Sequence, residues 1–131
     1  MWNLKNVLAL GMFLFGTTFL WMTASFAGRV PPPTGAVWTL ADSLALAAVG
    51  GFTVAAWAVF KESSWWHIAA LLSAIVGLVA LIPFVVGLIQ IRVAFADLGV
   101  QINLWMHVLG SAAIVALAGS AAARDLLVHR L

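Results

Sequence analysis

The sequence predicts an all-α integral membrane protein whose four transmembrane helices form an up-down bundle. Three observations predict this fold class: 65% of the 131 residues are hydrophobic, only 8% are charged, and four apolar segments are long enough to cross a bilayer. So few charged side chains cannot cover a globule of this size in water, whereas lipid favours an apolar exterior. We therefore expect a single transmembrane domain over residues 1–131, in the inner or plasma membrane of a prokaryotic cell.

The four predicted spans are apolar runs of roughly 20 residues or more, the length at which a helix crosses a hydrocarbon core of about 30 Å. The first run is uncharged, the second carries Asp42 near its start, and the third contains Pro83, which we expect to kink or locally break the helix. The first run is also too long for a cleaved signal peptide, so we expect it to be retained. The spans cover residues 7–27, 37–60, 65–90 and 103–123.

The connections between the spans predict the orientation. Residues 28–35 form a stiff connector with three consecutive prolines, residues 61–64 form a tight polar turn, and residues 91–102 have the mixed character of an interfacial segment. Basic residues in short connections favour the cytoplasm, and four of them accompany the termini against two on the other side, so we expect both termini in the cytoplasm. The side of the termini holds Lys5, Lys61, Arg124 and Arg130, and the other side holds Arg29 and Arg92.

The composition excludes several classes of function. Cysteine is absent, which removes disulfides, thiolate metal sites and cysteine nucleophiles. The six basic residues are scattered singly, so they do not form the basic patch that nucleic-acid binding needs. Neither a metal-ligand cluster, nor a phosphate loop, nor a nucleophile with a base is evident. We expect no catalytic residue, no metal and no required cofactor, and no enzymatic activity of the chain's own.

Asp42 and His107 are the strongest candidate functional residues. Asp42 is the only acid inside a predicted span, where burial of a carboxylate is costly, and His107 lies about four residues into the fourth span, at a similar depth. We hypothesise a hydrogen bond between them that orients the imidazole. The alternative is an acid at a helix start that pairs near the interface. The hypothesised bond would belong to an outer-leaflet polar cluster of Asp42, His107, Asn103, Gln101 and Arg92.

Histidine could also hold a cofactor. His67 begins the third span on the opposite side, about 30 Å from His107, so the two side chains cannot ligate one haem iron or metal ion together. A haem or quinone site would need a partner subunit, with His107 or His67 as a weak candidate. The alternative for each is a hydrogen-bonded boundary histidine.

Small residues recur at intervals of about four in the second and fourth spans. Such rows let helices approach closely, either inside the bundle or against another subunit. The predicted helix-packing residues are Ser43, Ala47, Gly51 and Ala55 in the second span and Ala112, Ala116, Gly119, Ser120 and Ala123 in the fourth.

These observations favour a non-catalytic accessory or scaffold subunit of a larger membrane complex. The stretch Thr34–Phe60, followed by Ser64–Trp66, is loosely similar to subunit 4 of actinobacterial cytochrome c oxidases, a small four-helix membrane subunit, and this resemblance implies a respiratory assembly. The alternative is a small oligomeric transporter or channel that uses Asp42. The small multidrug-resistance transporters also have four helices, but the essential acid of their first helix has no counterpart here. Expected partners are the lipid bilayer and other membrane subunits or further copies of the chain.

Overall fold

The computed structural model describes the backbone of residues 3–130 and the side chains as far as residue 126. Its described part is all-helical and contains no strand, which confirms the predicted all-α class. Four of its helical segments are long and apolar enough to cross a membrane, also as predicted. The elements are α1 (Leu4–Thr17), the 3-10 helices η1 (Thr18–Met22) and η2 (Ala24–Phe26), α2 (Ala36–Phe60), α3 (Trp66–Gln90), α4 (Leu98–Gly119) and α5 (Ala121–Arg130).

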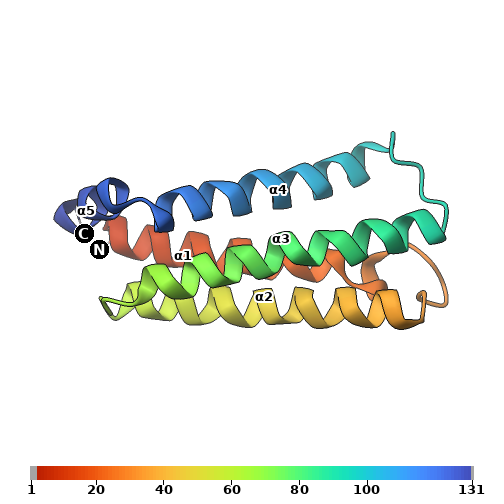
Figure 1. Cartoon of the computed structure of the whole chain (residues 1–131), viewed down its shortest axis with the longest axis horizontal. Coiled ribbons are helices and arrows are strands. Elements are labelled where there is room, and N and C mark those ends of the chain that lie inside the picture. Colours follow the sequence, from red (N-terminus) through yellow and green to blue (C-terminus); the bar gives the residue numbers. More distant parts are fainter. Residues whose placement is uncertain (1–2, 131) are drawn as a thin grey trace.

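The four long segments lie side by side along the long axis of the molecule (Figure 1). Their connections alternate between its two ends. One end, which we call the terminal end, holds both termini and the turn between α2 and α3, whereas the other, the loop end, holds residues 27–35 and 91–97. Helix α2 packs against α1 and α3, and α4 rests mainly on α3. This arrangement is an up-down bundle.

Helix α4 starts earlier than predicted. Whereas α2 and α3 begin and end within one residue of the expected spans, α4 begins at Leu98 instead of residue 103. Asp97 caps this start, because its Oδ1 accepts hydrogen bonds from the backbone N–H groups of Gly99 (2.9 Å) and Val100 (3.3 Å). The expected interfacial segment is therefore shorter, and it ends at Asp97.

The first membrane-length segment changes from α-helix to 3-10 helix at Thr18. The hydroxyls of Thr17, Thr18 and Thr23 each donate to the carbonyl three residues earlier, at 2.6–2.7 Å. Such bonds suit the tighter i to i+3 geometry of a 3-10 helix. In contrast, α3 runs without interruption through Pro83, so the expected local break is not found there.

The helices approach one another at glycines that face bulky side chains. A Cβ on Gly16 would lie 2.5 Å from Cβ of Phe52, and one on Gly87 would lie 2.7 Å from the Trp38 ring. Gly51 contacts the side chain of Ser73 in the same way. Because these glycines have no side chain of their own, a side chain of the neighbouring element packs directly against the helix backbone at each point.

The predicted rows of small residues are only partly inside the bundle. Gly51 and Ala55 face other helices, but Ser43 and Ala47 are exposed, because the buried face of α2 runs through its neighbouring alanines instead. On α4 the exposed members are Ala112, Ala116 and Gly119, while Ser120 and Ala123 are half-buried. Most of the α4 row therefore faces outward.

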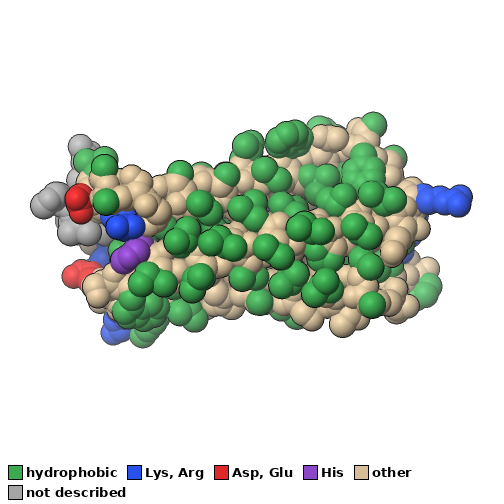
Figure 2. Space-filling model, viewed as in Figure 1, with side chains coloured by type: hydrophobic (Ala, Val, Ile, Leu, Met, Phe, Trp, Pro, Cys, Tyr) green, Lys and Arg blue, Asp and Glu red, His purple; other side chains and the backbone are tan. Residues whose placement is uncertain are grey.

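The outer surface is apolar along the sides of the bundle, and the charged groups in view lie at its two ends (Figure 2). Each of the four long segments exposes large aliphatic or aromatic side chains, among them Leu14, Leu46, Ile82 and Leu109. This distribution is the one expected of a protein whose sides face lipid.

Candidate functional site

His107 is fully buried in the middle of the bundle. It is the tenth residue of α4, which places it about 14 Å along the helix at a rise of 1.5 Å per residue. This position is deeper than predicted, because α4 begins five residues before the predicted span. An ionisable group at mid-span depth is a functional candidate by default, since its burial is costly.

Both ring nitrogens of His107 have hydrogen-bond partners. Nδ1 lies 2.7 Å from the carbonyl oxygen of Asn103, and Nε2 lies 3.2 Å from Oγ1 of Thr18. Because a carbonyl can only accept, we assign the proton of the neutral ring to Nδ1, and Nε2 then accepts from the Thr18 hydroxyl. That hydroxyl also lies 2.6 Å from the carbonyl oxygen of Phe15, so its one proton is shared between this oxygen and Nε2 of His107.

Aromatic rings enclose the imidazole. The ring centroid of Phe19 lies 4.6 Å from that of His107, and that of Phe15 lies 6.3 Å away. Phe19 in turn stacks on Phe52 of α2 at 5.7 Å. With its nitrogens engaged and its faces covered, His107 is not accessible to a haem iron held by a partner subunit.

His107 belongs to a row of polar side chains on α4 that we call the polar seam, formed by Asn103, His107 and Ser111. Asn103 Nδ2 donates to the carbonyl of Trp21 in η1 at 3.1 Å. Oδ1 of Asn103 and Oγ of the fully buried Ser111 have no partner among the described residues. The seam thus joins α4 to the 3-10 part of the first segment. The hypothesised partner of His107 was Asp42 of α2, whereas the seam contacts η1.

The structure does not bring Asp42 and His107 together. Oδ1 of Asp42 accepts from the backbone N–H of Ala24 at 2.8 Å, which caps the start of η2. Segment η1 packs against both α2 and α4, and its Phe19 contacts rings on each side. The hypothesised hydrogen bond is therefore not formed, because η1 and η2 lie nearer and supply partners for both side chains: Ala24 for Asp42 and Thr18 for His107.

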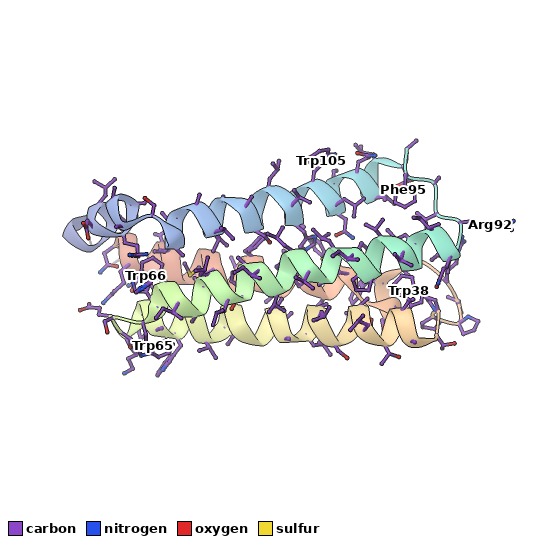
Figure 3. The ribbon with its side chains drawn as sticks, viewed as in Figure 1. Trp38, Trp65, Trp66, Arg92, Phe95 and Trp105 are labelled. Atoms are coloured by element: carbon purple, nitrogen blue, oxygen red, sulfur yellow. The ribbon has the colours of Figure 1, made fainter. Side chains whose placement is uncertain are left out.

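The rest of the predicted polar cluster also separates. Gln101 donates to the carbonyl of Phe95 at 2.6 Å and accepts from the indole of Trp105 at 3.0 Å, so it faces the loop end. It stands two residues before Asn103, roughly 200° around the helix, which explains why the two side chains diverge. Arg92 is exposed at the loop end (Figure 3). Of the five predicted residues, only Asn103 and His107 are neighbours.

His67 lies at the opposite end of the bundle, beside a cavity that we call the terminal cup. It is half-buried and packs edge-on against Trp66 at 6.0 Å. Nearby, Lys5 forms an ion pair with Glu62, and this hydrogen-bonded lysine lowers the pKa of the carboxyl. The cup has a volume of about 460 Å³ and is lined by Val59, Glu62, Ser63, Ser64, Trp66, His67, Arg124 and Asp125.

Together, the fold and the site define a bundle of four membrane-length helices with an enclosed polar seam and a cavity at one end. No group of three or more metal-ligating side chains is found in the part of the chain that the structure describes. No protein family, curated protein or solved structure matches this chain. The resemblance to an oxidase subunit therefore stays a prediction.

Proposed function

We propose that the chain is a multi-pass integral membrane protein with both termini in the cytoplasm, and that it serves as a non-catalytic subunit that binds a transmembrane helix of a larger membrane complex. The observation that carries the docking role is the outward face of α4, where small residues are exposed. The buried part of the site supports a structural role, because His107 is enclosed and Asp42 is engaged as a cap.

Membrane insertion is supported by the apolar sides of the bundle and by the charges at its ends. The orientation is supported by the excess of basic residues at the terminal end, where Lys5, Lys61 and Arg124 lie, over Arg29 and Arg92 at the loop end. A cytoplasmic terminal end satisfies this preference.

The outward face of α4 has the composition of a helix interface. Ala112, Ala116 and Gly119 are exposed, whereas the exposed positions of α3 carry large aliphatic side chains. In membranes, small residues mark the faces at which helices associate, because they let backbones approach closely. This face is well suited to receive a helix.

An apolar groove of about 300 Å³ lies on the opposite flank of α4, between α1 and α4. At its floor, a Cβ on Gly11 would meet no atom within 4 Å. Two copies of the chain joined through α4 would set alanines against alanines, whereas a different helix can set large aliphatic side chains against these small residues. The groove is lined by Leu4, Val7, Leu8, Gly11, Met12, Ile114 and Leu117.

The docking role is tested by extracting the tagged chain from its source membrane in a gentle detergent and identifying what it carries by native mass spectrometry. We expect a second membrane polypeptide in a fixed ratio. Ala116→Leu should weaken its retention about tenfold, or about 1.4 kcal/mol, because the added side chain holds the partner helix away.

The matched control is Ala47→Leu, the same substitution at an exposed position of α2. It should leave the complex intact. A chain that carries only copies of itself, or no partner at all, would contradict the docking role. Loss of the partner in Ala47→Leu but not in Ala116→Leu would place the interface on α2 and contradict an interface on α4.

The orientation has an independent test, because the chain contains no cysteine. Single cysteines introduced as Ser64→Cys at the terminal end and Ala96→Cys at the loop end can be labelled with an impermeant maleimide on intact cells. We expect label on the loop end alone, and label on the terminal end alone would reverse the orientation.

A further inference from the structure

The terminal cup collects hydrogen-bond donors at the end of the bundle where the predicted cytoplasmic surface begins. It lies between the turn that joins α2 to α3 and the start of α5, and charged side chains gather around it (Figure 2). Its lining joins apolar and polar groups, because Val59 and Trp66 belong to the core cluster of this end. A ligand that has both an apolar and a charged part matches such a lining.

Arg124 is the principal cation of the cup. It is half-buried, and its Nη1 donates to the carbonyl of Ala118 at 2.7 Å, which holds the guanidinium at the cup. Among the described residues, the ion pair between Lys5 and Glu62 is the only one, so Arg124 has no carboxylate partner there. Its remaining N–H groups are available to an anion.

The other donors of the cup also lack protein acceptors in the part of the chain that the structure describes. No hydrogen bond there uses the hydroxyl of Ser63 or Ser64 or the indole N–H of Trp66, although Trp66 is largely buried. The two acids of the lining do not meet these donors: Glu62 is paired with Lys5, and Asp125 is exposed. The cup therefore presents unused donors on Arg124, Ser63 and Ser64, beside two carboxylates of which Glu62 is already paired with Lys5.

We propose that the terminal cup binds a phosphate group, with Arg124 supplying the charge and the serine hydroxyls supplying further donors. A phosphate offers several strong acceptor oxygens, and a guanidinium can bind two of them at once. Two sources share this chemistry: the headgroup of an anionic phospholipid in the adjacent leaflet, and a soluble phosphate compound. The inference uses the membrane insertion proposed above but does not depend on a partner helix.

The test uses native mass spectrometry on the full-length chain in detergent. The chain is titrated with phosphatidylglycerol and, separately, with diacylglycerol that has the same acyl chains but no phosphate. We expect phosphatidylglycerol to be retained at least tenfold more strongly. Arg124→Gln should remove most of this preference, and Arg124→Lys should keep part of it, because lysine preserves the charge but not the paired N–H groups.

Arg92→Gln is the matched control, since Arg92 is an exposed arginine at the loop end. It should bind as the wild type does. If Arg124→Gln does not fold, the double variant Ser63→Ala/Ser64→Ala replaces it, with an expected weakening of about threefold. Displacement of the lipid by millimolar inorganic phosphate would assign the cup to soluble phosphates, and resistance to it would assign the cup to lipid.

Three outcomes would overturn the proposal. The first is equal retention of diacylglycerol and phosphatidylglycerol, which would show that the acyl chains alone bind. The second is an equal loss of binding in the Arg92→Gln and Arg124→Gln variants. The third is binding of neither phosphatidylglycerol nor inorganic phosphate. Because no partner polypeptide takes part, failure here is distinguishable from failure of the docking role.

Discussion

Gly77 of α3 lies against the edge of the Phe19 ring, and its replacement by alanine tests how tightly the centre of the bundle is packed. A Cβ at this position would lie 2.5 Å from Cζ and 2.6 Å from Cε1 of Phe19. Phe19 is fully buried, and the rings of Phe15, Phe52 and His107 surround it. The ring therefore has little room to withdraw.

The magnitude follows from this geometry. Carbon atoms in contact prefer about 3.5–4.0 Å, so the ring or the helix must move by about 1 Å. Overpacking of a tight core costs about 1–3 kcal/mol, and the higher helix propensity of alanine returns about 0.5–1 kcal/mol. We expect Gly77→Ala to lower the free energy of unfolding by about 1–2 kcal/mol.

The assay is reversible unfolding in mixed micelles, followed by circular dichroism as a denaturing detergent is added. The matched control is Gly50→Ala on α2, where a Cβ would meet no atom within 4 Å, and it should be neutral or slightly stabilising. Adding Phe19→Leu to Gly77→Ala should recover part of the loss, because the smaller side chain makes room. Equal unfolding free energies for Gly77→Ala and Gly50→Ala would refute the close contact.

Two further predictions concern polar contacts. Thr18→Val keeps the side-chain volume but leaves Nε2 of His107 buried without its partner, so the free energy of unfolding should fall by about 1–3 kcal/mol. The control Thr17→Val should lower it by less, because the Thr17 hydroxyl bonds only a carbonyl of its own helix. Because Lys5 lowers the pKa of Glu62 in the folded chain, this pair should stabilise the fold fully above the ordinary carboxyl value of about 4.5 and lose its effect as the pH falls through the lowered pKa. Glu62→Gln should remove that part of the acid sensitivity, and an unchanged pH profile of unfolding would show that the pair contributes nothing.

All four long apolar runs form helices, but the first covers Leu4–Met22 instead of residues 7–27 and the fourth covers Leu98–Gly119 instead of residues 103–123. Asp97 starts α4 early because its carboxylate caps the first N–H groups, and this N-cap signal was present in the sequence but was attributed to an interfacial loop. Thr17 and Thr18 draw the first segment into 3-10 geometry through bonds to the carbonyls three residues earlier. Hydropathy alone does not register either effect.

The candidate site could be predicted only in part. The predicted polar cluster included Asn103 and His107, which do lie together on one face of α4. Their partner was missed, because the hypothesis joined polar residues at similar depth and gave no weight to backbone carbonyls or to threonine hydroxyls. Inside a continuous α-helix each carbonyl accepts from the N–H group four residues later. Where the first segment becomes a 3-10 helix this pairing changes, and the carbonyl of Trp21 becomes available to a side chain of α4.

The sequence by itself determined the number of long helices, their apolar character and the confinement of most charges to the two ends. It could do so because a helix in lipid must satisfy its own backbone, which makes length and hydropathy sufficient signals. Only the tertiary structure decided which face of each helix turns inward. These helices are apolar all round, so their hydropathy barely distinguishes one face from another. Contacts such as Gly77 with Phe19 set the rotation instead, and with it the meeting of His107 with Thr18 and the separation of Asp42 from both.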